Sequence, residues 1–225
     1  MGRRKAASDA NRERILAAAR KLLLQENFSA FTMEAIAREA DVSRLTIYYQ
    51  FDSKAGLLEA LYDYLAKRGH MQRLADVFRQ GDDPLQILQD FIEVFTFFWA
   101  SDRDAIRRLH ALGEIDAEIG AGLRARNERR RNGLKVIVDR YSHMYRQLNV
   151  IMEADTIDML HMITSFEAFD ALANGRSFED VLRVIRKLAY SALGYLPPVV
   201  PADPKFWPGY RDAPTARSKR RRSRS

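Results

Sequence analysis

A short segment of this chain carries side chains suited to contact the base edges and phosphates of nucleic acid. Residues 44–50 predict a helix of about two turns, with Ile47 on its apolar side. The side facing away carries Leu45, Thr46 and Tyr49, flanked by Arg44, Tyr48 and Gln50. A guanidinium in such a place binds a guanine edge or pairs with a phosphate. Because a helix this short is unstable alone, its purpose must lie in what it displays.

The neighbouring residues predict the elements that would hold this helix in place. Thr32 is placed to cap a preceding helix, whose apolar residues recur at 33, 36, 37 and 40. The run 41–43 breaks that helix, and Ser43 is placed to cap the second one. The arrangement is typical of a helix-turn-helix motif, over about 32–51, that offers its second helix to the DNA major groove.

Residues of about 12–58 resemble the N-terminal domain of TetR-family transcriptional regulators. The matching pattern is RILAAARKLLLQENFSAFTMEAIAREADVSRLTIYYQFDSKAGLL. Two positions depart from the usual pattern: Asp41 stands where a glycine is common, and Leu45 where a small residue or proline is often found. Asp tolerates a left-handed turn better than most residues, so the fold is not threatened.

This resemblance implies an all-α fold, with a three-helix helix-turn-helix DNA-binding domain followed by a larger helical ligand-binding and dimerisation domain. We expect the domains to cover residues 1–55 and 56–196, with a flexible, basic tail at 197–225. Thr32, Ser43 and Lys54 stand at helix N-termini, where backbone N–H groups and the helix dipole favour phosphate, and Thr32 and Ser43 also cap their helices. The expected DNA contacts are Thr32, Ser43, Arg44, Leu45, Thr46, Tyr48, Tyr49 and Lys54.

Composition excludes several classes of protein. The chain has 225 residues, of which 47% are hydrophobic and 30% charged, and it has no cysteine, so disulfides and thiol chemistry are excluded. Its densest apolar run, 91–100, contains Glu93 and is too short to cross a bilayer. No signal peptide is visible, and a reducing cytoplasm is the expected location. We expect no cofactor, no metal site and no membrane partner.

The net charge of +7 is concentrated at the C-terminus. The last nine residues, RSKRRRSRS, hold six positive charges and no acid, so the remaining chain is nearly neutral. Such a tail either raises affinity for any duplex through counterion release or serves only as a solubilising end. The cations placed within or before the first domain, among them Arg12 and Arg14, are the better sign of nucleic-acid binding.

Beyond the motif the periodicity predicts helix after helix, with no strand pattern. We expect one long helix over 54–79, a restart at Asp83-Pro84, and final helices over about 153–173 and 178–194. Ser177 and Asp180 resemble a capping box before the last of these.

The last two helices carry an apolar stripe that has two interpretations. It is either buried within one subunit or, as the resemblance implies, part of a four-helix interface of a homodimer. A dimer is also expected physically, since two modules spaced by about 34–36 Å read successive major grooves. The residues expected in the interface are Leu160, Phe178, Leu182, Ile185 and Ala189.

Aromatic residues recur at helical spacing in the middle of the chain. Each one taken singly is better explained as core filling, but the resemblance implies an apolar cavity for an inducing ligand. The residues expected there are Phe95, Phe98, Trp99, His110, Phe166 and Phe169. A ligand that prefers one arrangement of the core would move the helix after the motif and lower affinity for operator DNA.

These features favour a sequence-specific regulator that binds a palindromic double-stranded DNA operator as a homodimer and is released by a small, largely apolar ligand. Repression is the usual mode of action in the family that the chain resembles, so we expect a repressor. An enzyme is not expected, because no catalytic residue set, Gly-rich phosphate loop or HExxH motif is present. The alternative is a helical ligand-binding or interaction module whose DNA binding is only non-specific, through its basic tail.

Overall fold

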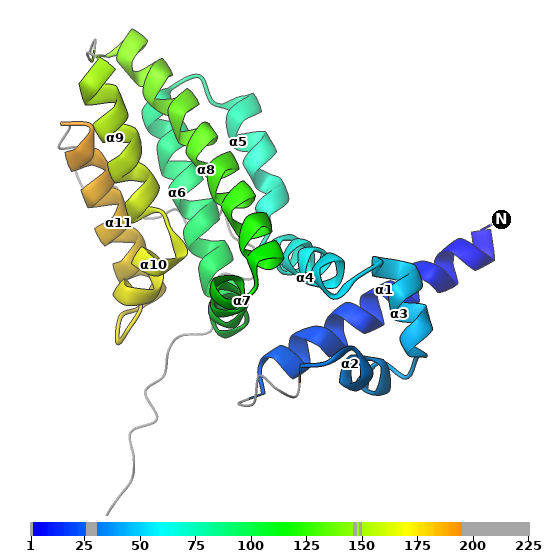
Figure 1. The fold of residues 1–225 in the computed structure, drawn as a ribbon. Coiled ribbons are helices and arrows are strands. Elements are labelled where there is room, and N and C mark those ends of the chain that lie inside the picture. Colours follow the sequence, from blue (N-terminus) through cyan, green and yellow to red (C-terminus); the bar gives the residue numbers. More distant parts are fainter. Residues whose placement is uncertain (1, 26–30, 146–147, 149, 195–225) are drawn as a thin grey trace, which may run out of the picture. The chain divides into compact units, whose positions relative to one another are not determined.

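The structure is a computed structural model that describes residues 2–25, 31–145, 148 and 150–194, and every regular element in these ranges is helical. Figure 1 shows the helices. They are α1 (Gly2–Leu23), α2 (Met33–Glu39), α3 (Arg44–Phe51), α4 (Lys54–Arg68), α5 (Leu74–Gln80), α6 (Pro84–Ser101), α7 (Arg103–Ile115), α8 (Ala117–Met144), α9 (Val150–Ile163), α10 (Phe166–Leu172) and α11 (Phe178–Ala192), with a 3₁₀ turn η2 (Met71–Arg73) before α5. The all-α prediction is confirmed. The predicted tail at 197–225 lies outside the described residues.

The described chain divides into two compact units. Unit 1 comprises the chain up to Arg68 together with Asp102–Asn127, so it contains α1–α4, α7 and the first part of α8. Unit 2 comprises Gly69–Ser101 and the described chain from Glu128 onwards. The helix-turn-helix motif therefore belongs to a unit that also takes up helices from much later in the sequence.

Unit 1 is built around a small apolar core. Ile15 of α1, Ile36 of α2 and Ile47 of α3 have no exposed surface, and Phe31 is also buried. Leu57 and Leu61 of α4 complete the core from the next helix. Each helix thus buries one apolar stripe, which explains why short helices such as α2 and α3 are stable here although neither would be stable alone.

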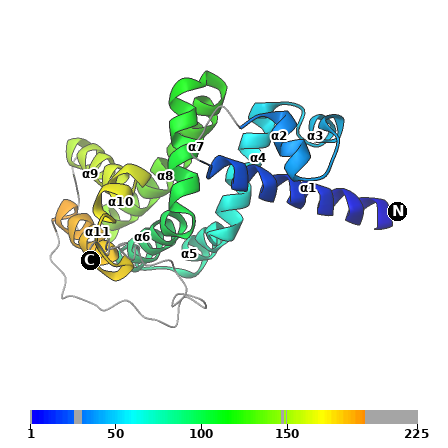
Figure 2. The ribbon, with the colours of Figure 1, turned by 90° about the horizontal axis from the view of Figure 1, so that it is seen from below.

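Unit 2 surrounds α6 with other helices. Almost the whole circumference of α6 is buried, including Phe91 and Phe98, and α5, α10 and α11 pack against it. Figures 1 and 2 show α10 and α11 beside α6, and α9 packs against α10 and α11. A helix that is hydrophobic all round is expected at the centre of such a bundle. None of the helices in the described ranges is long and apolar enough to cross a membrane.

Side-chain caps begin several helices where the sequence predicts them. The hydroxyls of Thr32, Ser43 and Ser177 accept hydrogen bonds from the backbone N–H groups of Ala35, Thr46 and Asp180 at 3.0–3.1 Å. The Asp83 carboxylate accepts one from the backbone N–H of Leu85 at 2.9 Å. These caps depend on residues three positions apart or closer, so the sequence alone is enough to identify them.

The prediction of one long helix over 54–79 is wrong. α4 ends at Arg68, and His70 adopts a left-handed conformation with φ 57° before η2 begins. Gly69, the first residue of unit 2, packs closely against α6, where a Cβ would lie 2.6 Å from the Phe98 ring. The expected helix over 153–173 is also interrupted, because Ser165 caps a new helix, α10, with its hydroxyl 3.1 Å from the Ala168 nitrogen. The first break depends on the tertiary packing of Gly69, and the second depends on a cap within an apolar run.

The corner between α3 and α4 requires a glycine. A Cβ at Gly56 would lie 2.1 Å from the carbonyl oxygen of Phe51, which belongs to the backbone. We expect Gly56→Ala to lower the free energy of unfolding by about 2–3 kcal/mol, as overpacking does. Urea denaturation followed by circular dichroism measures it. Helix propensity alone would raise stability by about 1 kcal/mol, so a more stable variant would contradict the close contact.

Candidate nucleic-acid interface

α2 and α3 form a helix-turn-helix with a left-handed residue in the turn. Asp41 has φ 51°, and the backbone N–H of Val42 bonds to the carbonyl of Ala37 at 3.0 Å. Aspartate therefore occupies the position where family members often have glycine, in the conformation that glycine adopts most readily. The turn is further fixed by Arg14 of α1, whose guanidinium donates to the carbonyls of Ala40 and Asp41 at 3.0 Å.

α3 has an anchored side and a displayed side. Ile47 and Phe51 are buried, whereas Leu45 is 78% and Tyr49 is 87% exposed. Leu45 and Tyr49 are four residues apart, so they lie next to each other on one face. Thr46 and Tyr48 are partly buried at the edges of that face. The displayed side is thus formed as the sequence predicts, and its role in DNA contact stays a prediction.

The N-termini of α3 and α4 carry groups suited to phosphate. Ser43 caps α3, and its hydroxyl also lies 2.8 Å from the hydroxyl of Thr46. Lys54 is exposed in the first turn of α4, where its ammonium lies 5.8 Å from the centre of the Phe31 ring. Lys54 therefore has a structural contact that the sequence did not reveal, and it remains accessible to an anion.

Arg44 is held by two neighbours within unit 1. Its Nη1 forms an ion pair with Glu34 of α2 at 2.5 Å, and its Nη2 donates to the Tyr48 hydroxyl at 3.1 Å. The hydrogen bond that Arg44 donates to Tyr48, and then the charge of Glu34, raise the pKa of Arg44 above its ordinary value. Arg44 is therefore oriented along α3, with an acidic partner that would have to be displaced or shared when DNA binds.

Removing the Glu34 carboxylate is expected to strengthen DNA binding. Glu34→Gln takes a negative charge from beside the DNA-facing helix and releases Arg44 from an exposed ion pair, which is a weak interaction in water. We expect operator affinity to rise by about two- to fivefold in fluorescence anisotropy at 0.15 M salt. Asp158→Asn, which removes the exposed acid paired with Arg131 in unit 2, is the matched control. Equal effects of both variants would argue against a local role for Glu34.

Three polar residues near the motif serve the fold and not the displayed surface. Arg12 donates to the carbonyl of Gln50 at 3.1 Å and lies 4.4 Å from the centre of the Phe51 ring. The Gln50 amide in turn donates to the Ser8 hydroxyl at 2.8 Å. With Arg14 at the turn, these contacts tie α1 to the motif. The sequence placed Arg12 and Arg14 among the cations that indicate nucleic-acid binding and Gln50 beside the displayed face, but all three bind within unit 1.

The residues expected to line a ligand cavity divide between the two units. Phe95, Phe98, Trp99, Phe166 and Phe169 are buried in unit 2, and His110 belongs to unit 1. Trp99 lies at the centre of the group in unit 2, with ring centroids 4.6 Å from Phe98 and 5.6 Å from Phe166. Its indole N–H donates to the carbonyl of Thr164 at 3.1 Å. The structure therefore brings Phe95, Phe98, Trp99 and Phe166 together as an aromatic core, and Phe169 is buried in the same unit.

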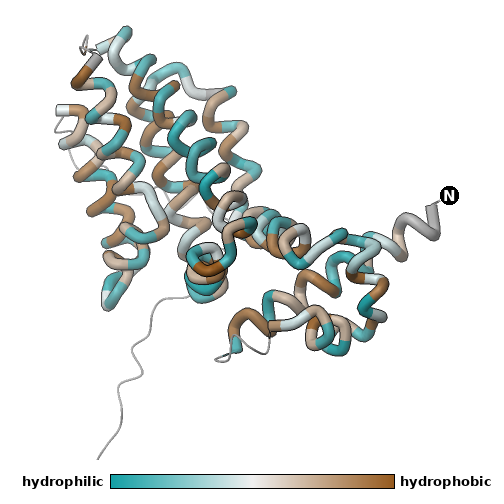
Figure 3. The backbone as a smooth tube through the Cα atoms, viewed as in Figure 1, coloured by the Kyte–Doolittle hydropathy of each residue, from teal (hydrophilic) through white to brown (hydrophobic). Residues whose placement is uncertain are grey.

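The residues expected at a dimer interface are mostly used inside unit 2. Leu160, Leu182, Ile185 and Ala189 are buried, and Phe178 is half-buried. The same helices nevertheless carry exposed apolar side chains, and Figure 3 shows hydrophobic and hydrophilic positions alternating along them. The exposed residues are Ile151, Met152, Met159 and Met162 of α9 and Leu188 of α11. The stripe read from the sequence is the inner face, and the outer face is a separate apolar surface.

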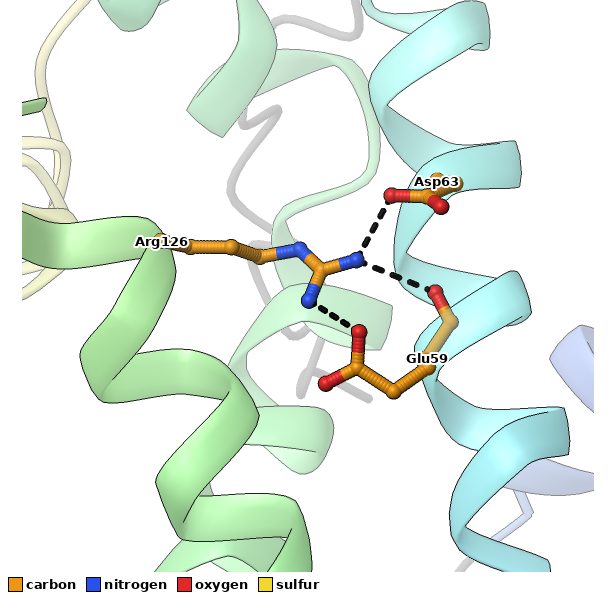
Figure 4. A network of polar contacts seen from close by, with 3 residues as sticks. All are labelled: Glu59, Asp63 and Arg126. Atoms are coloured by element: carbon orange, nitrogen blue, oxygen red, sulfur yellow. Dashed lines mark hydrogen bonds and ion pairs between the residues drawn. The ribbon is translucent and has the colours of Figure 1, made fainter. Parts of the chain in front are cut away.

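Arg126 links α8 to α4 within unit 1, a contact that no sequence motif signals. Figure 4 shows its guanidinium reaching from α8 to Glu59 and Asp63, which lie one turn apart on α4. It forms an ion pair with each carboxylate, at 2.6 Å for Asp63, and donates to the Glu59 carbonyl at 3.3 Å. Arg126 is the least exposed member of the network, so its guanidinium ties this part of α8 to α4 within unit 1.

Comparison with known proteins supports the interpretation of the N-terminal region. The family model described as "Bacterial regulatory proteins, tetR family" matches residues 15–61. The chain is 34% identical over 96 residues to the HTH-type transcriptional regulator EthR of Mycolicibacterium smegmatis. That match covers 42% of this chain and 44% of EthR, so it spans less than half of the relative.

Solved structures share the fold over most of the chain. A TetR transcription regulator from Haloarcula marismortui superposes with a TM-score of 0.64 at 21% identity, covering 82% of this chain and 96% of that one. Thermus thermophilus FadR, a TetR-family repressor in complex with lauroyl-CoA, superposes with a TM-score of 0.54 at 21% identity, covering 85% and 98%. At these identities the similarity concerns the arrangement of helices.

Proposed function

Because this chain belongs to the TetR family of transcriptional regulators, we propose that it is a DNA-binding helix-turn-helix regulator that represses transcription by binding a palindromic operator as a homodimer. The observation that carries the proposal is the displayed face of α3, where Leu45 and Tyr49 are exposed opposite the buried Ile47 and Phe51. A helix anchored in this way fits the major groove. The proposed site of action is the cytoplasm.

In the proposed complex the residues around α3 have distinct roles. Tyr49, Leu45 and Thr46 contact base edges, while Arg44 and Tyr48 bind at the border between bases and backbone. Ser43, Thr32 and Lys54 bind phosphates, because hydroxyls and an ammonium at helix N-termini lie in a region of positive potential. The cap contacts of Ser43 and Thr32 support this assignment, since they fix the direction of the helix ends.

The proposed dimer forms through the outer faces of α9 and α11. Met159, Met162 and Leu188 are 41%, 64% and 44% exposed, and α9 and α11 pack side by side in unit 2. Exposed apolar residues that gather on adjacent helices are typical of protein interfaces. Two copies joined here would present two α3 helices to two half-sites of one operator.

The proposed effector is a small, largely apolar molecule that binds among the aromatic residues of unit 2. The related repressor FadR of Thermus thermophilus binds lauroyl-CoA, which supports an apolar chain as the ligand class. Release from DNA would follow if the ligand favours a different position of α8, because Arg126 connects α8 to α4, the helix that follows α3. Such coupling amounts to about 1–3 kcal/mol, or about 5- to 150-fold in affinity.

Hydroxyl-radical footprinting on a selected operator tests the dimeric mode of binding. We expect two protected patches on one face of the duplex, about one helical turn or a small multiple apart, that appear together as protein is added. Lauroyl-CoA, used as the first effector probe, should remove both patches together. A single patch, or protection of the whole duplex without pattern, would argue against the proposal.

A further inference from the structure

The base-reading surface of α3 is unusually apolar, and this has a chemical consequence. Leu45 and Tyr49 project furthest, and the buried residues Ile47 and Phe51 lie on the opposite side of the helix. Leu45 ends in two methyl groups and has no hydrogen-bonding atom. An exposed leucine at this position contributes nothing to the core of unit 1, so its chemistry is available to a partner.

The polar side chains of the same helix are largely engaged within unit 1. The Gln50 amide binds the Ser8 hydroxyl, and Arg44 binds Glu34 and Tyr48. The Thr46 hydroxyl lies beside the Ser43 hydroxyl at 2.8 Å. The most accessible part of α3 is therefore a hydrocarbon side chain with a phenol ring one turn further on.

The major groove offers only one apolar group to such a surface. Adenine, guanine and cytosine present hydrogen-bond donors and acceptors there, whereas thymine also presents its C5-methyl group. The phosphate-binding groups near α3, the Ser43 cap and Lys54, would hold the helix against the duplex. A leucine pressed against a polar base edge would desolvate that edge without replacing its hydrogen bonds, which disfavours such sequences.

Resting on the proposed function, we propose that Leu45 is a specificity-determining residue that reads the C5-methyl group of one thymine in each half-site. The Tyr49 ring, one turn away, packs against the same methyl group from the C-terminal side of α3. The recognised feature is the methyl group itself and not the hydrogen-bonding edge of the base. The operator should therefore have an invariant thymine opposite the N-terminal turn of α3.

Removal of single methyl groups from the operator tests this directly. After an operator has been selected, each thymine is replaced in turn by deoxyuridine, which lacks only the C5-methyl group. The affinity of the native protein should fall about fourfold per half-site at one symmetric position, as expected for one buried methyl group. Fluorescence anisotropy at fixed salt measures each replacement.

The Leu45→Ala variant identifies the residue that reads the methyl group. It is expected to bind the thymine and deoxyuridine operators with affinities within 1.5-fold of each other, whereas the control Ile115→Ala, which removes an exposed apolar side chain of unit 1 outside α3, should retain the full difference. Since Leu45 is exposed, the variant should fold normally, which circular dichroism checks. Replacing the same base by 5-methylcytosine should cost less than replacing it by cytosine, because only the former keeps the methyl group.

Two results would overturn the inference. One is a native protein that binds every deoxyuridine operator as well as the original. The other is a methyl dependence that survives unchanged in Leu45→Ala, which would assign the contact to another residue. Failure to select any operator would instead contradict the proposed function itself, so the two failures are distinguishable.

Discussion

Replacing Met162 and Leu188 together by glutamate is expected to make the protein monomeric and to weaken operator binding at least a hundredfold. Both side chains are largely exposed in the protomer, so the new carboxylates stay hydrated there and unit 2 should fold. In a dimer built on α9 and α11 the same carboxylates would be buried without partners, at a cost of several kcal/mol each. The loss of affinity follows because a monomer contacts one half-site only.

Two measurements on this double variant follow its assembly and its binding to DNA. Light scattering at micromolar concentration gives the mass, and anisotropy with the operator gives the affinity. Val136→Glu is the matched control, since Val136 is a similarly exposed apolar residue of unit 2 on α8. The control is expected to remain dimeric. A native protein that is itself monomeric, or a double variant that stays dimeric, would contradict the proposed interface.

The second large effect is expected at a buried ion pair in unit 2. Arg186 of α11 pairs with Glu93 of α6, and their side chains are only 13% and 8% exposed. Arg186→Met leaves the Glu93 carboxylate buried without this partner, and we expect the free energy of unfolding to fall by about 3–5 kcal/mol. Urea denaturation at pH 7 measures it. The double variant Glu93→Leu with Arg186→Met should regain most of the loss, because an apolar pair avoids the cost of burying charge.

The pH dependence of this variant follows from the sign of the pKa shift. Burial raises the pKa of Glu93 above its ordinary value, and the charge of Arg186 opposes that effect. A carboxyl group whose pKa is raised by folding contributes stability below its unfolded pKa, and this contribution is lost as the pH rises through the folded pKa. Without Arg186 the pKa should rise further, so the stability deficit of Arg186→Met should be smaller at pH 5 than at pH 7.5.

The same sign applies to Asp90, whose pKa is also raised by burial and which lies near Arg186 and Arg73. Lowering the pH therefore also protonates the Asp90 carboxylate and removes the cost of burying its charge. A deficit that does not change between pH 5 and 7.5 would mean that Glu93 is not the group left unpaired. In the double variant with Leu at position 93, the remaining pH dependence should come from Asp90.

Features that depend on near neighbours in the sequence were predictable, and features that depend on tertiary contacts were not. Thr32, Ser43 and Ser177 cap helices as predicted, because a cap needs only a hydroxyl and a helix that begins beside it. Asp41 adopts the left-handed turn for a similarly local reason. The role of Arg12 could not be predicted, since its partners Gln50 and Phe51 are nearly forty residues away.

The same distinction explains the mistaken long helix and the unexpected network of Arg126. Periodicity continues through Gly69, and only the packing of Phe98 against it accounts for the break after α4. Arg126 reaches Glu59 and Asp63 across more than sixty residues of sequence, so their pairing has no local signature. An apolar stripe likewise does not tell whether a face is buried in one subunit or between two, as Leu182 and Leu188 of α11 illustrate.

We propose that the displayed face of α3 reads DNA sequence for a dimer. Selection of bound fragments from a pool of random duplexes, at near-physiological salt, tests it most directly when the native protein and Tyr49→Ala are compared. Tyr49 is 87% exposed, so the substitution changes the displayed surface and not the core. We predict a palindromic motif for the native protein that is lost in Tyr49→Ala. Recovery of no motif, with equal retention of DNA by both proteins, would contradict the account and assign DNA binding to the basic C-terminal tail.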